Sequence, residues 1–273
     1  MFRSSQQSIA HIQMGFAILL FGTALPVSQI LTSEVHVFDG TAIRLTVAAI
    51  LFLPMLWNRR DEIRRIGTSD ALLVFLIATS LVAVSGLMLC STKFAPCTVI
   101  CTVTSFTPIV TALGAIIFFR DRPKRKQLGW IVVAGCSALI LRSACTRAEA
   151  TNQEFLWLAL GVGLSVAAVF CEAAGILFAK VATRTLSPMT LAALSTLVSV
   201  LIILPFAIAD GTPISWTSLS TKAWLAGIWW GAGGITLGTW LWYSGIKQSS
   251  ATTAAAFLSL LPFVTVAISW IVN

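Results

Sequence analysis

The chain has 273 residues, of which 57% are hydrophobic and only 10% are charged, and its formal net charge is +8. A soluble domain usually carries about 25% charged residues, because its whole surface is hydrated. The composition therefore excludes a soluble enzyme and a disordered chain, and it indicates an integral membrane protein. Long apolar runs favour helices over a barrel, whose strands alternate apolar and polar residues.

Nine apolar segments have about the length that a helix needs to cross a bilayer. In chain order they are 12–32, 38–57, 70–90, 96–119, 127–142, 155–179, 187–209, 222–243 and 250–272. The first is too long for the apolar region of a signal peptide, so we expect it to be the first membrane helix. The connections are short and leave no room for a soluble domain.

Lysine and arginine gather in loops that fall on the same side of the membrane. The two richest loops contain Arg59, Arg60, Arg64 and Arg65, and Arg120, Arg122, Lys124, Arg125 and Lys126. Because cytoplasmic loops carry an excess of cations, we expect a cytoplasmic N-terminus in the plasma or inner membrane. These cations flank apolar runs, so the expected partner is the lipid bilayer and not nucleic acid.

The sequence resembles itself at a shift of 154 residues. This shift aligns Lys93 with Lys247, Thr98 with Thr252, Ser105 with Ser259, Pro108 with Pro262 and Val110 with Val264. It predicts two repeats, 8–142 and 155–273, and an odd number of helices in the first inverts the second across the membrane. Inverted repeats are typical of secondary transporters. The second copy lacks a counterpart of Arg120 to Leu141, so either the sequence is truncated or the protein ends before a tenth helix.

Two prolines in mid-helix are the first candidate site residues. Pro108 and Pro262 each remove a backbone donor, which predicts either a kinked helix that lines a cavity or a kink satisfied by neighbouring helices. Thr102 and Ser105 share a face of the fourth segment, and Ser259 is the counterpart of Ser105. Such hydroxyls either pack helices together or line a hydrated path.

Glu172 is the most informative ionisable residue, because it lies well inside the sixth segment. A charge at the membrane centre costs roughly 2.5–3.5 kcal/mol on insertion scales. Its helical neighbours are small or polar, which directs this face toward protein and away from lipid; they are Ser165, Ala168, Gly175 and Ala179. Glu172 is therefore either a proton-coupling site or one half of a structural ion pair.

Arg44 in the second segment is the complementary cation. It either binds an anionic group, pairs with a carboxylate as part of a gate, or extends its head toward the interface. Gln29 of the first segment completes the set of candidates for substrate or coupling contacts. No catalytic, cofactor or metal site is expected, because six cysteines and two histidines show no metal-binding spacing.

Four glycines of the eighth segment, Gly227, Gly231, Gly234 and Gly238, lie on one helical face. Such a face permits close approach of another backbone. It favours packing within the bundle over homodimerisation, so the oligomeric state is left open between a monomer and a weak homodimer.

The order of these motifs resembles the EamA-like branch of the drug/metabolite transporter superfamily. The matching positions are Phe21-Gly22 in place of a Trp-Gly step, Arg44, Thr107-Pro108, Arg120-Asp121 in place of Gly-Glu, Gly129, Ala134-Gly135 and Leu261-Pro262. The resemblance implies ten helices in two inverted five-helix repeats and a central cavity that opens alternately to each side. It also implies export of small metabolites, drugs or amino acids that is driven by protons.

We therefore expect an all-α membrane bundle of about nine helices, against ten in the family, with the second repeat lacking its last helix. The expected function is secondary transport of a small organic solute by alternating access, and not catalysis. One alternative is a non-transporting or inactive membrane subunit, because the tenth helix is missing. Another is a membrane-embedded enzyme, although the sequence shows no clustered histidines or paired aspartates.

Overall fold

The computed structural model describes residues 2–24, 27, 30–31, 33–35, 37–121, 129, 155–209 and 219–272. Over these ranges the chain is all-α, as predicted, and forms no strand. Five of the described helical spans are long and apolar enough to cross a membrane: Asp39–Trp57, Thr68–Thr92, Thr102–Phe119, Phe155–Ala182 and Pro188–Ile208. The span Thr102–Phe119 includes a two-residue interruption between two helices. The fifth predicted segment, 127–142, lies outside the described residues apart from Gly129.

The chain divides into two compact units, which are described separately. Unit 1 comprises residues 1–79, 178–249 and 263–273, and unit 2 comprises residues 80–177 and 250–262. Three helices contribute residues to both units: α5 (Thr68–Thr92), α9 (Phe155–Ala182) and α14 (Leu261–Val272). Each unit therefore combines segments from both proposed repeats.

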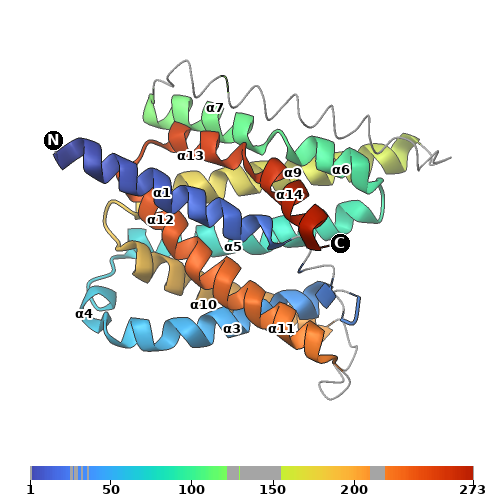
Figure 1. Ribbon diagram of the computed structural model, residues 1–273, viewed down its shortest axis with the longest axis horizontal. Coiled ribbons are helices and arrows are strands. Elements are labelled where there is room, and N and C mark those ends of the chain that lie inside the picture. Colours follow the sequence, from blue (N-terminus) through green and yellow to red (C-terminus); the bar gives the residue numbers. More distant parts are fainter. Residues whose placement is uncertain are drawn as a thin grey trace. The chain divides into compact units, whose positions relative to one another are not determined.

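Unit 1 is a bundle in which α1 (Phe2–Gly22) begins well before the predicted start near residue 12. Its other long helices are α3 (Val37–Trp57) and α10 (Pro188–Ala209), which pack against each other (Figure 1). The short helix α4 (Arg60–Ile63) follows α3 and leads into α5.

The eighth predicted segment, 222–243, is longer than expected and changes helix type in its middle. It contains α11 (Thr221–Trp229), a π-helix η1 (Trp230–Gly238) and α12 (Thr239–Gln248). Within η1, the hydroxyl of Thr236 donates to the carbonyl oxygen of Gly231, five residues earlier, at 2.9 Å. π-Helical turns are rare and often occur at functional sites.

The glycine face of this segment packs inside unit 1, as predicted for bundle packing. A Cβ on Gly231 would lie 2.7 Å from the carbonyl oxygen of Arg44, and one on Gly238 would lie 2.8 Å from the ring of Phe21. The missing side chains therefore let the backbones of α3 and η1 approach each other closely.

Unit 2 is built around the packing of α7 (Thr107–Phe119) on α13 (Ala251–Leu258), which Figure 1 shows side by side. Ala112 packs with Ala255, and Ala115 packs with Ala251. The residue number rises along α7 while that of its partner in α13 falls, so the two helices run antiparallel. The pairs are alanines, so little side-chain bulk separates the helices.

The fourth and ninth predicted segments are broken helices and not kinked ones. The fourth consists of α6 (Cys97–Thr104) and α7, and the ninth consists of α13 and α14, each with a two-residue interruption. Pro108 and Pro262 occupy the second position of α7 and α14, where a missing N–H does not interrupt the helix. The prolines therefore begin new helices, and this corrects the prediction of mid-helix kinks.

Candidate functional site

The membrane-embedded carboxylate of Glu172 lies at the break between α6 and α7. The hydroxyl of Thr107, the first residue of α7, donates to Oε2 of Glu172 at 2.9 Å. Thr107 is buried, at 4% exposure, and Glu172 is partly buried. The positive end of the α7 dipole lies at Thr107, and it favours a negative charge there. The break and the carboxylate thus form one constellation within unit 2.

The face of α9 that carries Glu172 contacts protein, as its small residues predicted. Ser165 and Ala168 are fully or almost fully buried. A Cβ on Gly175 would lie 2.8 Å from Oγ of Ser80 in α5, so that helix passes close by, one turn beyond Glu172. Glu172 thus contacts α7, and the helical face that carries it packs on α5 one turn farther along.

The remaining candidates of the fourth segment surround this break. Thr102 is a half-buried residue of α6, and Ser105 lies in the interruption itself. Pro108 is buried in the first turn of α7. Because Pro108 has no N–H, it donates nothing to the carbonyl of Thr104, and α6 ends there.

The second break repeats the backbone of the first with less polar side chains. Ser259 is buried, and its hydroxyl donates to the carbonyl of Ala256 at 2.6 Å. Leu261 occupies the position that corresponds to Thr107, and partly buried Pro262 follows it. The hydroxyl–carboxylate contact of the first break therefore has no equivalent side chain at Leu261.

Asp121, just beyond α7, holds the start of α13. Its Oδ2 accepts from the backbone N–H groups of Ala251 at 3.1 Å and of Thr252 at 3.4 Å. The N-cap Ser250 accepts from the N–H of Thr253 at 3.1 Å. Three of the four N–H groups that a helix start leaves unbonded are therefore satisfied.

Arg44 belongs to unit 1, whereas the sites described above belong to unit 2. Its guanidinium lies over the ring of Trp230 at 4.2 Å from the centroid, and its carbonyl oxygen faces Gly231. Trp230 is the first residue of η1, so the cation–π contact joins α3 to the start of the π-helix. Gln29, the remaining candidate, lies outside the described residues.

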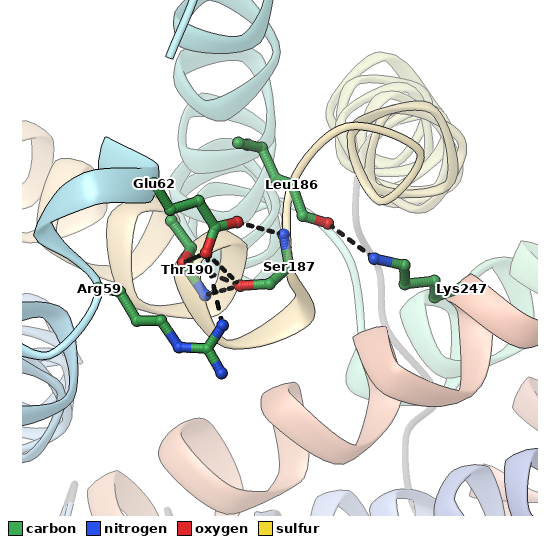
Figure 2. Close-up of polar contacts among 6 residues, drawn as sticks. All are labelled: Arg59, Glu62, Leu186, Ser187, Thr190 and Lys247. Atoms are coloured by element: carbon green, nitrogen blue, oxygen red, sulfur yellow. Dashed lines mark hydrogen bonds and ion pairs between the residues drawn. The ribbon is translucent and has the colours of Figure 1, made fainter. Parts of the chain in front are cut away.

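One end of unit 1 carries a second carboxylate that caps a helix, shown in Figure 2. Glu62 accepts from the N–H of Ser187 at 2.6 Å, from the hydroxyl of Ser187 at 2.8 Å and from that of Thr190 at 2.7 Å. Partial burial alone would raise the pKa of Glu62, but these bonds and Arg59 at 3.7 Å together hold that pKa below its ordinary value. Nearby, Nζ of Lys247 donates to the carbonyl of Leu186 at 3.4 Å.

Glu34 makes a similar contact with the start of α11. It accepts from the N–H of Ser220 at 2.8 Å and from the hydroxyl of the same residue at 2.5 Å. These bonds lower the pKa of Glu34 below its usual range. Ser220 in turn caps α11 by accepting from the N–H of Ala223. Glu34 thus holds the residue that begins α11.

The sequence pattern that defines the EamA-like transporter family matches residues 8–143 and 159–273, which together make up most of the chain. The chain belongs to the EamA-like transporter family. It is therefore a multi-pass membrane protein and a membrane transporter. In this EamA-like transporter, the described residues include the two broken helices, the carboxylate of Glu172 and the glycine-rich η1.

Comparisons with individual proteins agree with this assignment. The chain is 22% identical over 268 residues to the uncharacterized transporter YetK of Bacillus subtilis (strain 168), covering 98% of this chain and 80% of YetK. A solved crystal structure of a protein shares the fold with a TM-score of 0.78 at 18% identity, covering 97% of this chain and 87% of that one.

Sequence reasoning missed two helix-capping carboxylates of this EamA-like transporter, Glu62 and Asp121. The sequence indicated the two helix starts, because Ser187 before Pro188 and Ser250 before Ala251 are typical of such positions. The carboxylates come from segments more than a hundred residues away, so no local pattern links them to these helices. Within the described ranges, no group of three His, Cys, Asp or Glu side chains is placed to hold a metal ion.

Proposed function

We propose that this EamA-like transporter exports small organic solutes, such as amino acids, metabolites or drugs, by proton-coupled alternating access. The observation that carries the proposal is the hydrogen bond between Glu172 and Thr107 at the break of the fourth segment. A carboxylate inside a membrane helix is costly, so its presence beside a helix interruption favours a role in transport.

In this proposal the charged, proline and polar residues have different roles. Glu172 takes up and releases the coupling proton, and Arg44 orients an anionic group of the solute or pairs with an acid. Pro108 and Pro262 shape the walls of the path at the two breaks. The hydroxyls of Thr102, Ser105 and Ser259, with the amide of Gln29, supply polar contacts along these walls.

We further propose that the protein resides in the cell membrane with its N-terminus in the cytoplasm and functions as a monomer or a weak homodimer. The excess of cations in the loops that hold Arg59 to Arg65 and Arg120 to Lys126 supports this orientation.

Reconstituted liposomes containing a pH-sensitive dye test the coupling. Addition of amino acids, one at a time, should acidify or alkalinise the lumen with the wild-type protein, whereas Glu172→Gln should abolish the proton flux. Glu34→Gln is the matched control, because it makes the same carboxylate-to-amide change in a loop. Solute movement with unchanged pH dependence in Glu172→Gln would remove Glu172 from the mechanism.

A further inference from the structure

We propose that Thr107 is the positioning residue for Glu172: its hydroxyl holds the ionised carboxylate at the helix break and sets the pH at which Glu172 takes up a proton. This inference rests on the proposed function, because the coupling role of Glu172 is what gives its protonation a consequence. It adds a residue that is not among the proposed contacts with the solute or the proton.

The helix break explains why the hydroxyl of Thr107 is directed at Glu172. In a continuous helix, a threonine hydroxyl commonly bonds the carbonyl four residues earlier, which here belongs to Val103. That carbonyl instead accepts from the N–H of Phe106 at 3.1 Å, in the turn that ends α6. Thr107 begins a new helix, and its hydroxyl donates across to α9, at 2.9 Å from Oε2 of Glu172.

Within the described ranges, the hydrogen bond to the carboxylate of Glu172 comes from Thr107. The other charged side chains of unit 2 within the described ranges are Lys93, Arg120 and Asp121, and each lies at a helix end. Lys93 and Arg120 are exposed, and Asp121 is bonded to the start of α13.

The other polar groups near Glu172 are uncharged. From α5, the neighbouring helix face presents the hydroxyl of Ser80, and the adjacent thiol on α9 itself is that of Cys171. Since no cation among the described residues is paired with Glu172, the bond from Thr107 and the start of α7 are the contacts that favour its ionised form.

A change at Thr107 that removes only the hydroxyl should therefore move the protonation of Glu172. Thr107→Val keeps the side-chain shape and loses the donor, so Glu172 should become protonated about one pH unit higher than in the wild type. Thr107→Ser keeps the donor at the same backbone position and should leave the protonation midpoint where it is.

The test uses dicyclohexylcarbodiimide, which modifies protonated carboxyl groups in apolar surroundings. The full chain in liposomes is treated across a pH series, and the modified fraction of the peptide that contains Glu172 is measured by mass spectrometry. Glu172→Gln supplies the background. We expect a titration curve for the wild type, the same midpoint for Thr107→Ser, and a midpoint about one unit higher for Thr107→Val.

Coincident midpoints for the wild type and Thr107→Val would overturn the inference, as would an equal shift in Thr107→Ser. Circular dichroism and gel filtration report whether each variant is folded. If Thr107→Val does not fold, Thr107→Ala compared with Thr107→Ser makes the same test of the hydroxyl.

The two variants distinguish a failure of the proposed function from a failure of this inference. If Glu172→Gln retains pH-dependent transport while Thr107→Val shifts the modification curve, then Thr107 positions a carboxylate that does not couple transport. If Glu172→Gln loses the pH dependence while Thr107→Val matches the wild type, coupling stands and the role of Thr107 is refuted.

Discussion

Removing the carboxylate of Glu62 should destabilise the protein through the start of α10. Glu62 accepts two bonds from Ser187, the residue before α10, and one from Thr190 in its first turn. The side chain is 24% exposed, so water only partly replaces these contacts when they are lost. Replacement of a side chain that caps a helix start typically costs about 1 kcal/mol, and bonds to a charged acceptor contribute more.

We therefore expect Glu62→Ala to lower the free energy of unfolding by about 2 kcal/mol. For a chain of this size, that loss corresponds to a fall in the melting temperature of roughly 4–8 °C. Thermal unfolding in detergent micelles, followed by circular dichroism, measures it. Asp61→Ala is the matched control, because it removes the neighbouring exposed carboxylate of the same helix.

The pH dependence gives this prediction a second reading. The pKa of Glu62 in the folded protein lies below its ordinary value of 4.5, so its contribution is present above 4.5 and is lost as the pH falls through the lowered value. The melting-temperature difference between the wild type and Glu62→Ala should shrink on acidification below 4.5. Equal melting temperatures for Glu62→Ala and Asp61→Ala at neutral pH would refute the reasoning.

Three further predictions follow from other contacts, each measured by the same thermal unfolding. Gly231→Ala should cost about 1–3 kcal/mol because its Cβ would press on the carbonyl of Arg44, whereas Gly163→Ala, with nothing within 4 Å, should be neutral or stabilising. Asp121→Ala should cost about 1 kcal/mol by uncapping α13, and equal stability would show that water replaces the cap. Lys180→Met should cost about 1–2 kcal/mol, since Nζ donates to the carbonyls of Ile246 at 2.7 Å and Ser249 at 2.5 Å; an unchanged melting temperature would contradict this.

The helices were largely predictable from the sequence because membrane crossing demands long apolar runs. The bounds of α3, α5, α9 and α10 lie within three residues of the predicted segments. The type of local backbone was less predictable. A proline inside an apolar run is compatible with a kink or a break, and which one forms depends on tertiary contacts such as that of Thr107 with Glu172.

The candidate site was predictable only where burial makes a residue exceptional. Glu172 stands out because a carboxylate inside a membrane helix is rare and needs a polar partner. Its partner could not be named, because Thr107 lies 65 positions away and shares no local pattern with it. Arg44 was identified because a cation inside a membrane helix is also rare. Its contact with the ring of Trp230 could not be predicted, because nothing in the sequence marks Trp230 as the start of a π-helix.

The two breaks share one backbone pattern and differ in the chemistry of their side chains. At the shift of 154 residues, the described bounds of α6 coincide with those of α13, and Thr107 at the start of α7 coincides with Leu261 at the start of α14. Both interruptions are therefore followed by a helix with proline in its second position. The hydroxyl that bonds Glu172 exists only at Thr107, because leucine has no donor to offer at the equivalent position. The two breaks thus share a backbone pattern, but the hydroxyl–carboxylate bond is a property of the first break alone.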